Sequence, residues 1–548
     1  MKAFAALFDS LSFEPSRNGK LRLMTAFFRS QPDPERGYAL AALTETLKFQ
    51  HAKPALVRAL LEERIDPVLF NLSYVYVGDL SETVALLWPQ PDHPAGPPKL
   101  SEVVQTLASI SRASFPRQLT LWLDSLDEIG RWALLKLITG SLRIGVSARL
   151  AKTAVAAMAD RQPNEIEEVW HGLQPPYIEL FAWLEGRGPR PDTVDPTPFR
   201  PPMLAHPLEE RDAGGLDPQD FSAEWKWDGI RVQAVGADSP DGRRTAKLFS
   251  RAGEDVSAAF PDLIDSLLDP RFGTATLDGE LLVVREGRVE TFGTLQQRLN
   301  RKAVSARLLH DYPIHLRAYD LLTEGADDLR SLPFTARRKR LEAFVTGLGD
   351  ARIDLSPLVP FASWDDVAGY RLDPASAGAG LDADAIEGLM LKRRDSPYVP
   401  GRPRGLWFKW KRNPFNIDAV LMYAQRGHGK RASFYSDYTF GVWRERTGGD
   451  GNELVPVGKA YSGFTDQELA KLDRYVRTNT ISRFGPVREV EHSVEKGLVL
   501  EIAFEGLNRS TRHKSGVAMR FPRVSRIRWD KPTAEADRLD TLEAMLKD

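Results

Sequence analysis

The chain has 548 residues, 42% of them hydrophobic and 27% charged, with a formal net charge of −1. These values are ordinary for a globular protein, and a prior of roughly 150 residues per domain predicts three or four domains. The near-zero charge gives no chain-wide cationic field, so any surface for a polyanion must be assembled locally. The absence of cysteine excludes disulfides, thiolate nucleophiles and cysteine-ligated metal centres.

The N-terminal residues carry an apolar run, but Asp9 interrupts it and no small-residue cleavage pattern follows. We therefore predict a first helix there, not an export signal. No apolar run approaches the roughly 20 residues that span a bilayer, so no membrane role is expected. Together with the lack of cysteine, this favours a cytoplasmic protein.

Residues 1–190 show apolar residues at helical spacing and no strand alternation, which predicts an all-α domain. Ser125 and Glu128 form a capping-box pattern that predicts a helix over 129–138, which Gly140 would end. Ser147 is placed to cap a second helix over 148–158.

The connection between these two helices, residues 142–147, places Arg143 beside a helix N-terminus. Backbone N–H groups and an arginine side by side suit a phosphate. Taken alone, the segment is more simply interpreted as a short helix-to-helix connection with a solvated arginine, since connections of this length are common.

Residues 186–202 are rich in proline and glycine and predict a semi-rigid spacer at a domain boundary. The next part, 199–412, mixes predicted strands, such as 277–284 and 314–322, with helices such as 295–307. Mixed order of this kind predicts an α+β domain.

From residue 413 to 548 the pattern is mainly one of strands and turns, with predicted strands over 417–423 and 498–504. One helix is predicted over 466–477, and leucines at helical spacing predict a short closing helix after Lys531. A small β-barrel of the oligonucleotide-binding type (OB-fold) fits this composition.

Lys226 lies in the run Glu-Trp-Lys-Trp-Asp-Gly-Ile-Arg at 224–231. Two flanking indoles predict a partly dry surrounding for its amine, in which a neutral, nucleophilic form is easier to reach than in water. Asp228 and a glycine after it predict a sharp turn, because glycine tolerates positive φ. Taken alone, Lys-x-Asp-Gly is more often a strand that ends in a turn.

Further motifs follow in order: Leu-Asp-Gly-Glu-Leu at 277–281, Ala-Tyr-Asp-Leu-Leu at 318–322, Glu-Gly-Leu-Met-Leu-Lys at 387–392 and Trp-Phe-Lys-Trp-Lys at 407–411. This series resembles the nucleotidyltransferase motifs of covalent ligases and capping enzymes. Met-Leu-Ala at 203–205, Arg-Phe-Pro-Arg at 520–523 and Arg-Trp-Asp-Lys at 528–531 narrow the resemblance to ATP-dependent DNA ligases of the bacterial and archaeal type.

The resemblance implies three domains: a helical DNA-binding domain (1–190), an α+β nucleotidyltransferase core of the ATP-grasp-like ligase type (199–412), and an OB-fold domain with a C-terminal helix (413–548). It implies sealing of nicked double-stranded DNA through a lysyl-AMP intermediate, a DNA-adenylate and attack by the 3′-hydroxyl. We expect a monomer that associates with the nucleoid through DNA and uses ATP with Mg²⁺ or Mn²⁺.

The resemblance makes Lys226 the nucleophile, with Asp228, Lys409 and Lys411 in the catalytic set. A lysine can form a phosphoramidate that is also a good leaving group. Lysines two apart on a strand share a face, where their charge can stabilise the attacked phosphate. The resemblance assigns nucleotide contacts to Glu224, Lys226, Arg231, Arg251, Glu280, Tyr319, either Arg402 or Arg404, Lys409, Arg528, Asp530 and Lys531.

Glu280 and Glu387 are the expected ligands of the divalent metal, since hard carboxylate oxygens suit Mg²⁺. The resemblance also assigns the ribose to Glu280, the adenine amino edge to Glu224 and the adenine ring face to Tyr319. Arg143 and Arg251 are the expected DNA contacts. The polar hairpin tip at 236–244 receives no role.

Other classes fit less well. An NAD-dependent ligase would carry a zinc module with four cysteines, and a capping enzyme would not need the helical domain. A P-loop ATPase is excluded because no Gly-Lys is followed by Ser or Thr. A non-catalytic nucleic-acid clamp remains as an alternative, although every expected reactive position is filled.

Overall fold

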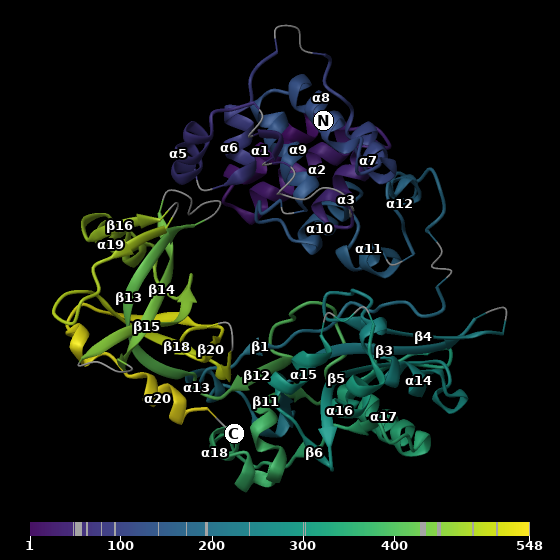
Figure 1. Ribbon diagram of the computed structural model, residues 1–548. Coiled ribbons are helices and arrows are strands. Elements are labelled where there is room, and N and C mark those ends of the chain that lie inside the picture. Colours follow the sequence, from purple (N-terminus) through teal and green to yellow (C-terminus); the bar gives the residue numbers. More distant parts are fainter. Residues whose placement is uncertain are drawn as a thin grey trace. The chain divides into compact units, whose positions relative to one another are not determined.

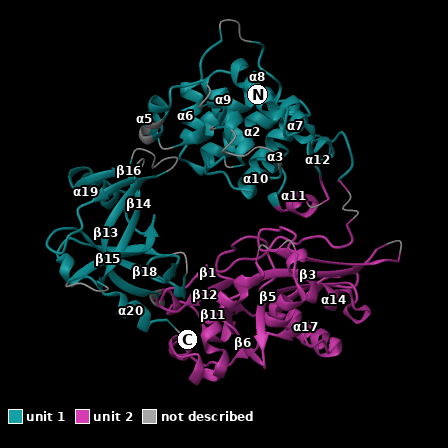
Figure 2. Ribbon diagram, viewed as in Figure 1, with its two compact units in different colours: residues 1–163, 174–190, 414–548 teal, residues 164–173, 191–413 magenta. Residues whose placement is uncertain are grey.

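The computed structural model describes residues 1–546 apart from 48, 50–56, 58, 62–63, 78, 92–94, 141, 171, 192–194, 240–241, 300, 302, 428–433, 447–450, 485–486 and 511–512 (Figure 1). The chain divides into two compact units (Figure 2). One contains residues 1–163, 174–190 and 414–548, and the other contains 164–173 and 191–413. Within the described residues, no helix is both long and apolar enough to cross a lipid bilayer.

The N-terminal region of the first unit is helical, as the apolar spacing predicted. Helix α10 packs on α2, and α1 and α6 pack on α9. Its helices are α1 (Lys2–Phe13), α2 (Arg17–Ser30), α3 (Glu35–Leu43), α5 (Pro67–Val77), α6 (Leu80–Leu87), α7 (Leu100–Ser109), α8 (Phe115–Ser125), α9 (Glu128–Thr139), α10 (Ala148–Met158) and α12 (Ile178–Leu184). Most of α11 (Pro163–Trp170) belongs to the second unit.

The predicted cap of α10 is confirmed, because the Ser147 side chain accepts a hydrogen bond from the backbone N–H of Leu150. The predicted cap of α9 is wrong. Ser125 is the last residue of α8, and the Asp127 carboxylate accepts from Gly130 N–H at the start of α9. Asp and Ser are equally good N-caps, so the capping-box pattern did not select between them.

A buried arginine joins two ends of the helical region. The guanidinium of Arg36 donates to both Asp33 and Glu185 and lies 4.3 Å above the ring of Phe181. Its side chain is 5% exposed. The hydrogen bond from Arg36 is the main cause that lowers the pKa of the Glu185 carboxyl, to about 2, against an opposing effect of burial.

We expect Arg36→Met to lower the free energy of unfolding by about 2 kcal/mol at neutral pH, because it leaves two carboxylates without their buried cation. Since the pKa of Glu185 is lowered from 4.5 to about 2, this contribution is complete above pH 4.5 and is lost as the pH falls towards 2. Denaturant unfolding of both proteins at several pH values measures it. A difference that persists undiminished at low pH would contradict the ion-pair origin.

The second unit contains two mainly antiparallel sheets, in which β1 pairs parallel to β12 and β9 pairs parallel to β7. The first has the order β1-β12-β11-β2-β10, and the second runs β4-β3-β5-β7-β8, with β6 paired to β5 and β9 paired to β7. The strands are β1 (His206–Pro207), β2 (Phe221–Trp227), β3 (Ile230–Asp238), β4 (Arg244–Ser250), β5 (Ala275–Arg285), β6 (Arg288–Val289), β7 (Ile314–Glu324), β8 (Asp327–Asp328), β9 (Ile353–Leu355), β10 (Leu358–Val359), β11 (Ile386–Arg393) and β12 (Trp407–Lys411).

Helices complete this α+β unit: α13 (Glu210–Ala213), α14 (Pro261–Leu268), α15 (Phe292–Leu295), α16 (Ala306–Asp311), α17 (Phe334–Leu348) and α18 (Trp364–Leu372). The single helix predicted over 295–307 is wrong. Two short helices, α15 and α16, and a 3₁₀ turn η4 (Gln296–Arg298) take its place. Arg298 explains the break, because its fully buried guanidinium donates to Asp262 and to the carbonyls of Ala259 and Tyr312.

The C-terminal part of the first unit is rich in strands, as predicted. Its main sheet has the order β15-β14-β13-β17-β16, and β18 pairs with both β13 and β21. The strands are β13 (Phe415–Arg426), β14 (Tyr435–Glu445), β15 (Asn452–Ala460), β16 (Thr480–Phe484), β17 (Val487–Val490), β18 (Val499–Phe504), β19 (Gly506–Arg509), β20 (Val517–Arg520) and β21 (Arg523–Arg528), with helices α19 (Asp466–Thr478) and α20 (Leu539–Ala544).

Candidate functional site

Lys226 lies where the chain passes from one sheet of the second unit to the other. Strand β2 ends at Trp227, and β3 begins at Ile230. A Cβ on Gly229 would lie 2.4 Å from the carbonyl oxygen of Leu281 and 2.7 Å from Cγ of Glu280. The glycine is therefore required by the close approach of β5. The predicted reason, a positive φ, is wrong, since Gly229 is absent from the glycines with positive φ.

The register of the first sheet places the predicted lysines side by side. Lys226 on β2 is opposite Gly388 on β11, and Gly388 is opposite Lys411 on β12. Met390 similarly lies between Glu224 and Lys409. Because cross-strand partners and residues two apart share a face, all four charged side chains belong to one face of this sheet.

Glu387 reaches this face through a bulge. The pairing of β11 with β2 shifts register between Ile386 and Gly388, and Gly388 has φ +144°. A bulge of this kind redirects a side chain. The Glu387 carboxylate lies 2.6 Å from Nζ of Lys226 and 3.3 Å from Nζ of Lys411.

The charged side chains around Lys226 shift the pKa values of their neighbours. Burial raises the pKa of the Glu387 carboxyl, but the positive charges of Lys226 and Lys411 outweigh it and the net pKa is lowered. Burial raises the pKa of Glu280 to about 8, against Lys226 and Arg231 and with Glu387 adding to the increase. Burial lowers the pKa of Lys409, as do, in decreasing order, Lys411, Lys226, Arg402 and Arg251. The site therefore gathers several cations around two carboxylates.

The two indoles beside Lys226 do not surround its amine. Trp225 and Trp227 are about 4% exposed and pack in a hydrophobic core with Leu389, Leu391 and Trp410. Alternation along β2 directs them to the opposite face from Lys226, whose side chain is 23% exposed. The expectation that the indoles dry the amine is wrong.

Glu224 lies on the same face as Lys226 but is buried. Its carboxylate lies 2.8 Å from Nζ of Lys392 and 3.3 Å from the guanidinium of Arg338. Burial raises its pKa despite both cations. Lys392, 1% exposed, also lies 4.6 Å from the ring centroid of Tyr319. Lys392 therefore contacts both the Glu224 carboxylate and the ring of Tyr319.

Tyr319 also lies at a shift of register, in the pairing of β5 with β7. The pairing of β5 with β7 shifts register between Asp278, opposite Asp320, and Gly279, opposite Ala318, and leaves Tyr319 as the extra residue. Burial, followed by the charge of Asp278, raises the pKa of its hydroxyl. Arg231 lies on β3, on the other side of β5 from Tyr319. It forms a two-point ion pair with Asp278, donates to Met203 O at 2.8 Å, and lies 5.9 Å from the Tyr319 ring.

Two further arginines approach this cluster. Arg251 follows β4, and its pKa is lowered by burial and by the charges of Arg231 and Arg402. The charge of Arg402, in the 401–405 loop, lowers the pKa of both Arg251 and Lys409. The carbonyl of Arg402 also lies 3.2 Å from Nε2 of His206 on β1. In the hairpin tip, Arg244 pairs with Asp238 at 3.0 Å, and residues 240 and 241 are outside the described residues.

Among the residues that the structure describes, no group of three or more histidines or acidic residues is arranged to hold a metal. Mg²⁺ needs fewer protein ligands when substrate phosphates and water complete its octahedron. Glu280 and Glu387 fit that requirement, because burial and the negative charge of Glu387 disfavour the ionised form of the Glu280 carboxyl. A divalent cation would offset that penalty.

Four predicted residues belong to the first unit. Arg143 has φ +50° and an exposed side chain in the connection between α9 and α10, where Lys20 of α2 donates to Ile144 O. Arg528, Asp530 and Lys531 lie together at the end of β21. Arg528 donates to Asp530 at 3.1 and 3.0 Å, and both Arg528 and Lys531 contact Asp418.

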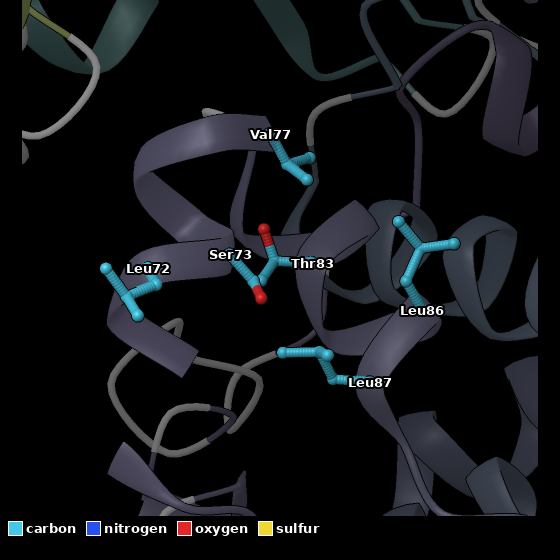
Figure 3. A pocket seen from close by; sticks show the side chains of 6 residues that line it. All are labelled: Leu72, Ser73, Val77, Thr83, Leu86 and Leu87. Atoms are coloured by element: carbon cyan, nitrogen blue, oxygen red, sulfur yellow. The ribbon is translucent and has the colours of Figure 1, made fainter. Parts of the chain in front are cut away.

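The helical region also contains an apolar cavity of about 310 Å³ between α5 and α6 (Figure 3). It is lined by Leu72, Ser73, Val77, Thr83, Leu86 and Leu87. None of these side chains titrates or carries charge, so the cavity is not a candidate for the chemistry.

Sequence reasoning missed Asp278, Lys392, Arg338 and Tyr398. Tyr398 is 3% exposed and donates to Asp278 at 2.6 Å, next to Arg231. Asp278 and Lys392 lie inside motifs that were singled out, so their charge within strand patterns was an available signal. Arg338 and Tyr398 lie outside those motifs, and only the fold brings them to the site.

Residues 202–411 match the family model described as ATP dependent DNA ligase domain, and residues 431–531 match the model described as ATP dependent DNA ligase C terminal region. A probable DNA ligase of Koribacter versatilis is 34% identical over 430 residues, which cover 76% of this chain and 71% of that protein. DNA ligase 1 of Korarchaeum cryptofilum is 30% identical, with 81% and 78% covered.

A solved structure named Pmar-Lig_PreS3 has a TM-score of 0.58 and 15% identity, and the match covers 96% of this chain and 99% of that one. At this identity the likeness concerns the fold, and it extends through the helical, α+β and strand-rich regions. Two family models in the expected order, together with relatives at 30–34% identity over most of the chain, place this protein in the family of ATP-dependent DNA ligases.

Proposed function

We propose that this enzyme seals nicks in duplex DNA by three successive transfers, with Lys226 as the covalent carrier of AMP. Nζ of Lys226 attacks the α-phosphorus of ATP, a P–N bond forms and pyrophosphate leaves. The 5′-phosphate at the nick then takes the AMP, and Nζ of Lys226 leaves. Attack by the 3′-hydroxyl on the activated 5′-phosphorus forms the phosphodiester and releases AMP.

The observation that carries this proposal is the placement of Lys226 beside Glu387, 2.6 Å away, with Lys411 3.3 Å from the same carboxylate. An amine, a neighbouring acid and several cations on one strand-edge face suit attack on a phosphate that accumulates negative charge. Attack requires the neutral amine, so the ion pair between Lys226 and Glu387 must separate first. Lys411 would then remain as the cation beside Glu387.

Glu280 and Glu387 would hold a divalent cation, Mg²⁺ or Mn²⁺, which when bound supplies positive charge to the triphosphate and orients it. Lys409, Lys411, Arg251 and Arg402 form the cationic surroundings of the same phosphates. The pKa of Lys409 is lowered by burial and by these neighbours, as expected where cations are gathered to bind a polyanion.

For the base and sugar, we assign the adenine ring face to Tyr319, the adenine amino edge to Glu224 and the ribose to Glu280. Arg231 is held by Asp278 and lies 5.9 Å from the Tyr319 ring, which supports a role in positioning the nucleotide. Of the two candidate arginines at 402 and 404, we choose Arg402 because its charge acts on Lys409.

The proposal assigns duplex binding to the helical domain, residues 1–190, with Arg143 as a phosphate contact. The adenylation domain is placed at 199–412, and the strand-rich region, 413–548, is assigned as an OB-fold. Arg528, Asp530 and Lys531 of that domain are assigned to the β- and γ-phosphates of ATP. We treat the active species as a monomer on one nick.

Incubation with α-labelled ATP, Mg²⁺ and nicked duplex tests the proposal. We expect acid-labile labelled protein first, then labelled DNA-adenylate, then sealed strand. Protein that seals nicks without ever carrying label would refute the covalent intermediate. Protein that takes label but never seals would refute ligation as the activity.

Lys531→Ala should slow formation of enzyme-AMP from ATP by about 10²-fold, because it removes a cation from the leaving pyrophosphate. Pyrophosphate takes no part in the later steps, so sealing of a nick that already carries 5′-adenylate should stay within about twofold of wild type. Single-turnover rates of the two reactions give the comparison. Equal losses in both would point to a folding or DNA-binding defect.

A further inference from the structure

A single carboxylate in the C-terminal domain contacts both cations of the Arg528–Lys531 cluster. Oδ2 of Asp418 lies 3.3 Å from Nη1 of Arg528 and 2.7 Å from Nζ of Lys531. The three side chains are 14–22% exposed. Asp530 binds the other side of the Arg528 guanidinium, at 3.1 and 3.0 Å.

The sheet register explains this convergence. Val420 on β13 is opposite Val499 on β18, and Val499 is opposite Arg528 on β21. Asp418 lies two residues before Val420 and therefore points to the same face. The long Arg528 side chain thus reaches back across β18 to the Asp418 carboxylate.

The backbone of Asp418 fixes the segment that follows Lys531. Its N–H donates to the Asp537 carboxylate at 2.7 Å, and its carbonyl accepts from Asp537 N–H at 2.8 Å. Ala536 packs against Val420 and Val499 in the same small core. Lys531 is therefore held on both sides, by Arg528 before it and by the anchored segment after it.

We propose that Asp418 is a positioning residue that holds Arg528 and Lys531 as one preorganised pair for the pyrophosphate portion of ATP. This inference rests on the proposed function, which assigns both cations to those phosphates. Two long cationic side chains repel each other and lose much rotamer freedom when they bind one ligand. A carboxylate between the two cations reduces their repulsion and restricts their rotamers before ATP binds, so less free energy is lost on binding.

Both cations keep capacity for a ligand while bound to Asp418. The guanidinium of Arg528 has five N–H donors and uses three, and the ammonium of Lys531 has three and uses one, among the described residues. Asp418 therefore orients them without occupying them. Oδ1 of Asp418 is buried and has no hydrogen-bond partner there, so the carboxylate contacts both cations through one oxygen.

The test compares Asp418→Asn with wild type in three reactions of the full-length protein. We expect formation of enzyme-AMP at subsaturating ATP to slow by about tenfold, as for the loss of one charged hydrogen-bonding partner. Reversal of enzyme-AMP by inorganic pyrophosphate should slow by a similar factor, because it passes through the same transition state. Sealing of a pre-adenylylated nick should change by less than about twofold.

Asp466→Asn is the matched control, an exposed acid of the same domain at the first turn of α19. It should leave all three rates unchanged. Asp418→Glu keeps the charge and should recover part of the lost rate. In a Lys531→Ala background, Asp418→Asn should have a smaller effect than in wild type, because one of its two partners is already gone.

Wild-type rates of enzyme-AMP formation for Asp418→Asn, or faster ones, would overturn the positioning role and leave the proposed function standing. Equal slowing of all three reactions with a lowered melting temperature would assign Asp418 to stability alone. If Asp418→Asn does not fold, Asp418→Glu decides, since a purely structural role predicts no selective loss in the two pyrophosphate reactions. Wild-type protein that takes no label from ATP would refute the proposed function and this role with it.

Discussion

Lys226→Ala should form no detectable enzyme-AMP, a loss of about 10³-fold or more, because no other group can take over a removed nucleophile. The structure gives this variant a good prospect of folding. Lys226 is 23% exposed, and Glu387 keeps Lys411 at 3.3 Å when Lys226 is gone. Labelling with α-labelled ATP and peptide mapping of the adduct measure the effect.

Lys226→Arg should fail as completely, since a guanidinium keeps the charge beside Glu387 but stays protonated and cannot attack phosphorus. Lys339→Ala, at an exposed lysine on α17 of the same unit, is the matched control and should label like wild type. Label that persists on the 221–231 peptide of either Lys226 variant would show that another residue carries the AMP.

Much of the site could be predicted from sequence because strand alternation is a strict rule. Side chains two residues apart on a strand lie on the same face, so Lys409 and Lys411 were expected to act together. The strand register adds Lys226 to that face. The motifs also gave Glu280 and Glu387 as acids near that edge. These relations depend on neighbours along one or two strands, which local patterns describe well.

Bulges were not predicted, and they decide the direction of two side chains. Glu387 and Tyr319 both occupy register shifts, and each would point elsewhere in a regular ladder. A bulge depends on how two strands distant in sequence pair, so it leaves little local signal. The same holds for Gly229, where the packing of β5 against the turn explains the glycine better than its own backbone angles do.

The helix predicted over 295–307, which the structure interrupts, shows the same limit of local sequence patterns. One continuous helix was predicted over 295–307, but Arg298 is fully buried and bound to Asp262 and to the carbonyls of Ala259 and Tyr312. The hydrogen bonds of the buried Arg298 guanidinium outweigh the modest helix propensity of this segment, because a buried charge without a partner costs roughly several kcal/mol. Asp262 lies on a different helix, so this preference could not be read locally.

Removal of residues 1–161, which contain most of the helical region, should separate self-adenylylation from DNA binding. A chain that begins at Gln162 should still form enzyme-AMP, because the proposed nucleotide contacts lie after it. It should bind nicked duplex much more weakly than the full chain. Starting at Gln162 keeps α11, whose Glu168 lies 3.5 Å from Arg330 in the second unit. A start at Phe199 would remove that contact and confuse a binding loss with destabilisation.

Salt dependence makes this test quantitative. Each phosphate contact adds about 0.9 to the slope of log affinity against log salt, so a protein with roughly six to ten contacts loses about 10³–10⁵ in affinity between roughly 50 and 200 mM salt. The shortened chain should show a slope reduced by about 0.9 for each contact that the helical region makes. Binding of fluorescent nicked duplex, titrated at several salt concentrations, measures both slopes.

The single substitution Arg143→Ala in the full-length chain tests the same assignment. Because Arg143 is exposed and the adjoining backbone is held by Lys20, the change should not disturb the fold. It should lower the slope by about 0.9, the value for one phosphate contact, and leave labelling by ATP unchanged. Equal affinity and equal slope for the full and shortened chains would contradict a role of residues 1–161 in duplex binding. An unchanged slope for Arg143→Ala alone would remove only this residue from the contact surface, since other basic residues of the helical region could then supply the contacts.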